Sequence, residues 1–185
     1  METDYYLLAI IPNQQARLAL QKTRRTLYQA FGLISALALE PVIPITILNH
    51  KLQKDKAMSL LTPPETENVK TPSFSLTGVS LEENFIFLDI AETEIVHPLR
   101  RLLKEFEMEG EIPVPRHTGL LLAHCEGKKS SEIFGFLQNS SVLSQHWNSS
   151  RIGLYELSLD RKNPELWDAV SWGLIWQFPF RKSLA

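Results

Sequence analysis

The chain has 185 residues and a mass of 21.1 kDa, and 44% of its residues are hydrophobic against 22% charged. This composition can fill the core of one domain, and it excludes a wholly disordered chain. Lys and Arg (19) nearly balance Asp and Glu (21), and the resulting formal net charge of −2 does not suit a protein that coats duplex DNA. The single cysteine, Cys125, excludes an internal disulfide and a cysteine-rich zinc site.

The sequence also lacks the features of a membrane or secreted protein. No uninterrupted apolar run approaches the roughly 18 to 20 residues that are needed to cross a bilayer. The first residues include Glu2 and Asp4, where a signal peptide would carry basic side chains. We therefore expect a soluble, cytoplasmic protein with no membrane partner.

The first part of the chain alternates between strand-like and helix-like patterns. Asp4–Ile11 is a continuous apolar run, typical of a strand that is buried on both faces. Gln14–Phe31 has apolar residues near helical spacing, and the asparagine before it and the glycine after it are suited to cap a helix. Val42–Leu48 is the next predicted strand, and Pro44 within it indicates an edge strand or a bulge.

A polar segment, 50–72, separates these elements from the middle of the chain, and we expect it to form a loop or a lid. Phe74 and Leu76, followed by Phe85–Ile90, predict two strands of a hairpin. Ile95–Met108 carries a helical stripe of apolar residues. The last predicted elements are a strand over Arg116–His124, a helix over Ser130–Phe136, a strand over Ile152–Leu159 and a helix over Glu165–Trp176, which begins a helical tail over 165–185.

A short internal repeat runs through this order of elements. In each half of the chain, a helix rich in Arg and Leu is associated with a proline-flanked strand that carries a threonine. The two strands contain Pro44-Ile-Thr46 and Arg116-His-Thr118. Two copies of one β/α unit that face each other across a cleft would produce this pattern.

Several segments together resemble a known family. They are the opening strand ending in Ile11-Pro12, Pro44-Ile-Thr46-Ile, Phe74-Ser-Leu-Thr-Gly78, Phe85–Ile90, the Ile95–Met108 helix and Pro115-Arg-His-Thr118. Over roughly residues 4–160 their order is similar to that of the two-histidine phosphoesterase superfamily, which includes bacterial 2′-5′ RNA ligase-like and RNA 2′,3′-cyclic phosphodiesterase proteins. The resemblance implies an α+β fold for residues 1–185, a single domain in which two pseudo-symmetric lobes of antiparallel sheet form a concave cleft with helices packed outside.

The resemblance also implies chemistry on cyclic phosphates or 2′-linked phosphodiesters, without a metal or another cofactor. Each lobe of the family contributes a His-x-Thr or His-x-Ser motif, and side chains two residues apart on a strand share a face. One histidine can then act as general base and the other as general acid, while the hydroxyl groups hold the phosphate.

This sequence departs from the motif at both histidine positions. Pro44 stands at the first position, and Arg116 stands at the second in the most natural alignment, with Thr46 and Thr118 retained. An arginine can clamp an anion, but it stays protonated near neutral pH and is a poor general base. In the alternative register His117 takes the histidine position and Gly119 the threonine position, and a slip of one residue exchanges the two faces of a strand.

We therefore predict a protein of the 2′-5′ RNA ligase-like group with impaired catalysis, which keeps a cleft for a nucleotide or an RNA end. The predicted phosphate-binding residues are Thr46, Arg116 and Thr118, and no metal site is expected. Two alternatives remain open at the level of sequence. One is an active phosphodiesterase in which His117 is catalytic, and the other is a protein–protein interaction module on the same fold.

Overall fold

The computed structural model describes residues 2–48, 55, 56, 59, 73–91, 96–106, 117–125, 130–144, 146–160 and 170–179. The predicted loop or lid over 50–72 therefore lies outside the described residues, except for three positions, and so does Arg116. None of the helices in the described ranges is both long and apolar enough to cross a bilayer.

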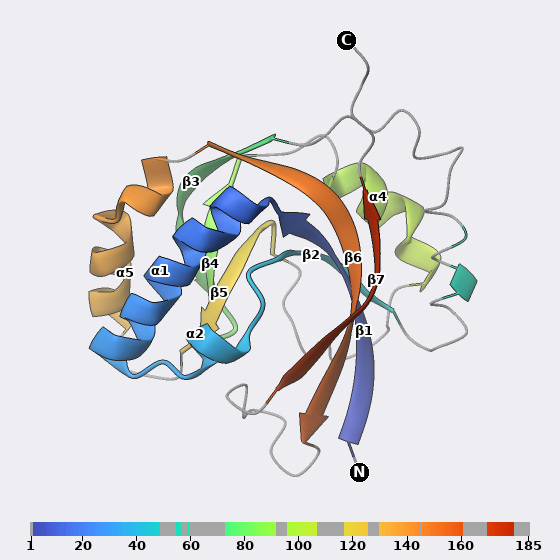
Figure 1. The fold of residues 1–185 in the computed structure, drawn as a ribbon, viewed down its shortest axis with the longest axis horizontal. Helices are drawn as coiled ribbons and strands as arrows, with labels where there is room; N and C mark the ends of the chain where they lie inside the picture. Colours follow the sequence, from blue (N-terminus) through green and yellow to red (C-terminus); the bar gives the residue numbers. More distant parts are fainter. Residues whose placement is uncertain are drawn as a thin grey trace.

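The strands form one antiparallel sheet, in the order β2-β1-β6-β3-β4-β5, with β7 paired to β6 (Figure 1). The long strand β6 belongs to both parts of the sheet, because its first residues pair with β3 and the rest pair with β1. The bounds are β1 (Glu2–Pro12), β2 (Ile43–Leu48), β3 (Ser73–Glu82), β4 (Phe85–Ile90), β5 (Gly119–His124), β6 (His146–Asp160) and β7 (Ser171–Pro179).

The strand order has an internal symmetry. In the first lobe, β1 lies between β2 and β6, and in the second lobe β4 lies between β5 and β3. A helix connects β1 to β2, and another helix lies between β4 and β5. The expected α+β fold with two similar antiparallel lobes is therefore confirmed, and the lobes meet where β6 pairs with β3.

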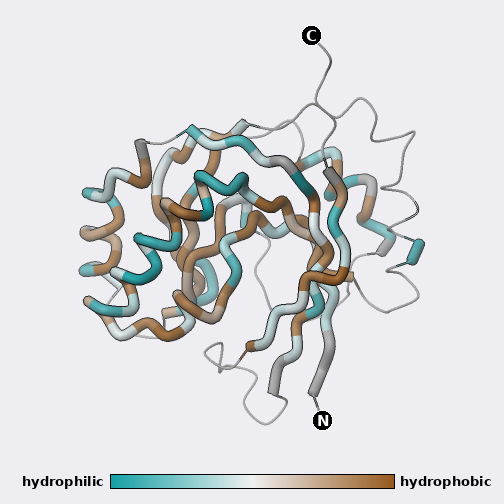
Figure 2. Tube along the Cα trace, in the orientation of Figure 1, coloured by the Kyte–Doolittle hydropathy of each residue, from teal (hydrophilic) through white to brown (hydrophobic). Residues whose placement is uncertain are grey.

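The helices lie on the outside of this sheet. In Figure 1, α1, α2 and α5 lie together on one side, and α4 lies on the other. The first helix has the predicted ends, because the Asn13 side chain accepts a hydrogen bond from the backbone N–H of Ala16 and Gly32 adopts a left-handed conformation. Figure 2 shows its hydrophilic and hydrophobic stretches alternating along the helix. The helices are α1 (Gln14–Phe31), α2 (Ser35–Ala38), α4 (Val96–Leu102) and α5 (Ser130–Gln138), with 3₁₀ turns η1 (Lys104–Phe106) and η2 (Ser141–Ser144).

Two hydrophobic clusters fill the two faces of the sheet. The first, which we call the helix-side cluster, contains residues of α1, α4 and α5 and residues of strands in both lobes. Examples are Leu20 and Leu99 from the helices, and Leu8 and Leu88 from the strands. The second, which we call the inter-lobe cluster, consists mainly of strand residues from both lobes. Its buried members are Leu7, Ala9, Ile11, Leu39, Val42, Ile47, Phe85, Phe87, Leu121, Tyr155, Leu157 and Val170.

The predicted helix over Glu165–Trp176 is wrong where the structure describes it, because β7 occupies Ser171–Pro179. The spacing of Trp172 and Trp176 fits one turn of a helix, but apolar residues at 172, 174, 176 and 178 also fit the alternation of a strand. Backbone pairing with β6 decides between the two patterns. The remainder of the predicted tail over 165–185 lies outside the described residues.

The buried tyrosine of the inter-lobe cluster leads to a test of this packing. Burial, assisted by the negative charge of Glu40, raises the pKa of Tyr155 to about 12. Between pH 10 and pH 12 an unfolded chain loses this proton whereas the folded chain keeps it, so the free energy of unfolding falls as the pH rises. We expect Tyr155 to account for about 2 to 3 kcal/mol of this fall.

Denaturant unfolding of the wild type and of Tyr155→Phe, at pH 9 and at pH 12, measures the effect. The wild type should lose more stability than the variant over this interval, because phenylalanine has no proton to lose. Equal losses in the two proteins would contradict the burial of the Tyr155 hydroxyl.

Candidate functional site

The strand β2, which contains the first motif segment, and the strand β5, which follows the second, lie at opposite ends of the strand order and nevertheless meet. The backbone N–H of Leu121, in β5, donates to the carbonyl oxygen of Val42, just before β2, at 2.9 Å. The Ser35 hydroxyl of α2 also donates to the carbonyl oxygen of His124 at 2.7 Å. The sheet therefore curves until its two ends are joined, and this curvature places both motif segments at one location.

A bulge in β2 interrupts the alternation expected for Pro44 and Thr46. Pro44 pairs with Ala9, whereas Thr46 pairs with Leu8, and the register shifts between them. Because neighbouring residues of β1 point to opposite faces, the side chains at 44 and 46 do not share one face. Ala9 belongs to the inter-lobe cluster and Leu8 to the helix-side cluster, so Thr46 lies on the face that packs against α4.

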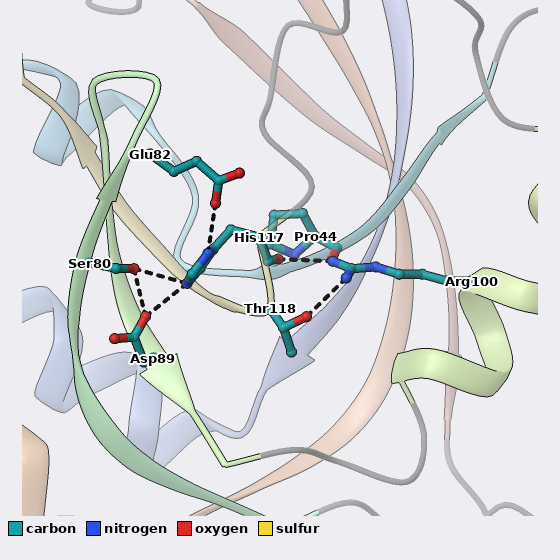
Figure 3. Close-up of polar contacts among 7 residues, drawn as sticks. All are labelled: Pro44, Ser80, Glu82, Asp89, Arg100, His117 and Thr118. Atoms are coloured by element: carbon teal, nitrogen blue, oxygen red, sulfur yellow. Dashed lines mark hydrogen bonds and ion pairs between the residues drawn. The ribbon is translucent and has the colours of Figure 1, made fainter.

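Arg100, from α4, connects the two motif segments (Figure 3). Its Nη2 donates to the carbonyl oxygens of Pro44, at 3.0 Å, and His117, at 2.8 Å. Its Nε donates to the carbonyl oxygen of Ile45 at 3.1 Å, and its Nη1 donates to the Thr118 hydroxyl at 2.9 Å. One guanidinium therefore binds acceptors of β2 and of the segment leading into β5. The fixed fork of N–H donors in arginine makes such a bridge geometrically possible.

His117 points away from Arg100, toward the strands of the second lobe (Figure 3). Its Nδ1 lies 2.8 Å from Oε2 of Glu82, and its Nε2 lies 2.8 Å from Oδ1 of Asp89. The Ser80 hydroxyl donates to Asp89 at 2.6 Å and lies 2.9 Å from the same Nε2. The imidazole also packs against Phe87, with 4.6 Å between ring centroids. We call Ser80, Glu82, Asp89 and His117 the His117 cluster.

The hydrogen bonds of the His117 cluster constrain its protons. An ionised carboxylate can only accept, so both contacts of the ring are hydrogen bonds only when Nδ1 and Nε2 each carry a proton. Glu82 and Asp89 also place two acidic side chains beside the ring, which disfavours a phosphate at this point.

Gly119 explains how His117 fits against the strand. A Cβ at position 119 would lie 2.7 Å from Cδ2 of His117 and 2.9 Å from the carbonyl oxygen of Leu88. His117 and Gly119 therefore lie on the same side, beside Phe87 of the inter-lobe cluster, and a threonine at 119 does not fit there. Residues 117 and 118 precede β5, and which of the two alignments to the family motif applies stays a prediction.

The predicted site residues are thus only partly brought together. The hydroxyl of Thr118 is bound by Arg100, and that of Thr46 is buried without a hydrogen-bond partner. Their binding of a phosphate stays a prediction, as does that of Arg116, which lies outside the described residues. Within the described ranges, no three His, Cys, Asp or Glu side chains are grouped so as to hold a metal ion.

Sequence reasoning missed the residues that contact the motif segments. Arg100 lies among other charged residues of the predicted helix Ile95–Met108, and a cation in such a pattern usually lies in solvent, so the pattern gives no signal for its contacts. A signal for the His117 cluster was present in the alternation of Ser80 and Glu82 along β3 and in Asp89, which interrupts the apolar run of β4. These side chains meet because of the register between β3 and β4. A register shift in this pair of strands places Gly78 opposite Asp89 and Ser80 opposite Phe87.

The Arg100 bridge leads to a prediction with a control on the same helix. We expect Arg100→Met to lower the free energy of unfolding by about 2 kcal/mol or more, because three carbonyl oxygens and one hydroxyl lose a charged donor. Arg100→Lys should restore only part of this loss, since an ammonium group cannot reach all four acceptors.

The control is Arg101→Met, which removes an exposed arginine from the next position. Its effect should stay within about 0.5 kcal/mol. Denaturant unfolding measures all three variants, and an equal loss in Arg100→Met and Arg101→Met would show that the bridge does not hold the motif segments.

The geometry can now be compared with known proteins. No family model and no curated protein sequence matches the chain. Solved structures do match over nearly its whole length. E. coli LigT complexed with 3′-AMP has a TM-score of 0.57 at 13% sequence identity, covering 97% of this chain and 99% of that one.

Two further matches agree with the first. E. coli LigT complexed with phosphate has a TM-score of 0.55 at 13% identity and covers 98% of this chain and 100% of its own. A crystal structure of a phosphoesterase has a TM-score of 0.54 at 13% identity, with coverage of 97% and 100%. The chain therefore has the fold of the LigT structures, the fold expected from the resemblance to two-histidine phosphoesterases.

Proposed function

We propose that the protein binds a nucleotide or an RNA end through its phosphate and does not carry out two-histidine phosphoesterase catalysis. One observation carries the second half of this proposal. Pro44, at the first motif position, has no proton to exchange, and both ring nitrogens of His117 lie 2.8 Å from carboxylate oxygens. Neither motif segment therefore presents an imidazole nitrogen that is open to a substrate.

The chemistry of the family depends on imidazole nitrogens that are open to the substrate. Cleavage of a cyclic phosphate needs a base to take a proton from water and an acid to protonate the leaving oxygen. Arg100 cannot supply the base because a guanidinium stays protonated, and its nitrogens already donate to the backbone of both segments. These contacts of Arg100 also stabilise the meeting of the two lobes.

The fold supports the first half of the proposal. Structures with this fold have been determined in complex with 3′-AMP, with phosphate and with ATP. These ligands share a phosphate group, and two of them carry an adenine. A chain that keeps the fold while losing the proton-transfer groups is best described as a binding protein for ligands of this class.

A second candidate function rests on the contacts of Ser80. Its hydroxyl lies 2.9 Å from Nε2 of His117, and Glu82 lies 2.8 Å from Nδ1, which is the order hydroxyl, imidazole, carboxylate used in nucleophilic catalysis. This arrangement favours an active hydrolase that depends on His117. The competing acceptor Asp89, at 2.6 Å from the hydroxyl, makes Ser80 a poorer nucleophile and places this function second.

The third candidate function is a protein–protein interaction module, and the inter-lobe cluster supports it. Buried leucine and phenylalanine side chains from both lobes occupy the face that would otherwise border a cleft. Absence of any nucleotide binding would favour this function over the other two.

An activity assay separates the first two functions. We expect no hydrolysis of 2′,3′-cyclic AMP by the wild type beyond the background given by His117→Ala, because no general base is open. A two-histidine phosphodiesterase of the family, assayed in parallel, serves as the positive control. Turnover by the wild type that disappears in His117→Ala would instead establish the hydrolase.

A binding assay tests the remaining half of the proposal. Addition of 3′-AMP at 100 times its dissociation constant should stabilise the folded protein by about 2.7 kcal/mol, measured as a rise in melting temperature. A panel of nucleotides and 2′,3′-cyclic RNA ends that produces no shift would contradict phosphate binding.

A further inference from the structure

A cavity of about 640 Å³ lies in the first lobe, apart from the residues of both motif segments. Its volume is within the range of small-molecule sites, which is about 300 to 1,000 Å³. Its walls come from the end of β1, the start of α1, the segment after α2, and the paired strands β6 and β7. The lining residues are Ile11, Pro12, Gln14, Arg17, Glu40, Arg151, Tyr155, Trp172, Leu174 and Gln177.

The charged side chains of the cavity favour an anion. Among the described residues, two arginines, Arg17 and Arg151, line it together with one acidic residue, Glu40. The cavity also lies at the N-terminus of α1, whose first turn contains no acidic residue to offset the positive end of the helix dipole. The summed field is therefore positive where an anionic group would enter.

Neither arginine is fixed by a strong internal contact. Arg17 lies 3.9 Å from Glu40, and the two side chains are 53% and 38% exposed, so this ion pair contributes little to stability. Arg151 donates from Nη1 to Oε1 of Gln177 at 2.7 Å, which uses one of the five N–H donors of a guanidinium. Both groups can thus donate to a bound phosphate without the loss of a buried contact.

Other lining residues of the cavity are aromatic and aliphatic. Tyr155 and Trp172 contact each other edge to face, with 5.7 Å between ring centroids. Gly153 allows Ile11 and Leu174 to lie close over β6, because a Cβ there would be 2.6 Å from Ile11 and 3.0 Å from Leu174. A flat ring can pack on such a surface, and stacking on aromatic side chains stabilises a bound base by roughly 1 to 3 kcal/mol.

We propose that this cavity binds a mononucleotide, with the phosphate held by Arg17 and Arg151 and the base packed against Trp172. The inference rests on the proposed function, because that function supplies the class of ligand. It differs in the site: binding takes place in the first lobe, beside the start of α1, and does not use Arg116 or the threonines of the motif segments.

Isothermal titration calorimetry with 3′-AMP tests the site. We expect Arg17→Ala and Arg151→Ala each to weaken binding by about tenfold or more, since each removes a charge-assisted hydrogen bond to the phosphate. Adenosine and inorganic phosphate, titrated separately, should each bind more weakly than 3′-AMP. Arg25→Ala removes an exposed arginine of α1 that does not line the cavity, and its affinity should equal that of the wild type.

A variant that strengthens binding excludes a folding defect as the explanation. Glu40→Gln removes an acidic group of the cavity and the competing partner of Arg17, so we expect binding to tighten by roughly two- to fivefold. Unchanged or weaker binding by Glu40→Gln, together with normal binding by Arg17→Ala and Arg151→Ala, would overturn the inference.

Failure of the inference and failure of the proposed function give different results. Binding that survives in Arg17→Ala and Arg151→Ala but is lost in Arg116→Ala would place the ligand at the motif segments, so the inference would fail while the proposed function stood. A wild type that binds neither 3′-AMP nor any other nucleotide would contradict the proposed function itself, and the cavity with it.

Discussion

The pairing of β6 with strands of both lobes is the interaction on which the rest of the structure depends. Residues 146–148 pair with β3, and residues 149–160 pair with β1. Since the backbone hydrogen bonds of one continuous strand hold both lobes, the two lobes are joined in a single sheet. Curvature of this sheet brings its ends together, where the N–H of Leu121 donates to the carbonyl oxygen of Val42. The candidate site exists because the chain places β2 and β5 at those two ends.

At this meeting point the polar side chains make contacts that hold the two segments in place. The guanidinium of Arg100 binds backbone carbonyl oxygens of both segments, and the carboxylates of Glu82 and Asp89 hold the imidazole of His117. The inter-lobe cluster then fills the adjoining face with apolar side chains. The open cavity with its two arginines lies beside the start of α1, and two members of the same cluster, Ile11 and Tyr155, line it.

Local sequence patterns predicted an element correctly where the pattern fitted only one type of secondary structure. The helix α1 has the predicted bounds because Asn13 and Gly32 cap it through contacts within a few residues. The proline in β2 correctly indicated an edge strand with a bulge. The pattern failed at Trp172 and Trp176, whose spacing fits a helix as well as a strand, because the pairing partner, β6, lies in a separate segment of the chain. It also failed at Arg100, whose acceptors are 17 residues or more away in sequence.

The sequence by itself determined the order of the elements up to β6, the repeat of a β/α unit and the absence of a histidine at position 44, because these follow from residue identity and from interactions over one or two turns. Only the tertiary structure decided which face each motif side chain occupies. A bulge of one residue turns Thr46 toward α4, and the space above Gly119 turns His117 toward Glu82 and Asp89. These outcomes depend on strand register and on close contacts between distant segments, and such contacts are fixed only when the whole sheet has formed.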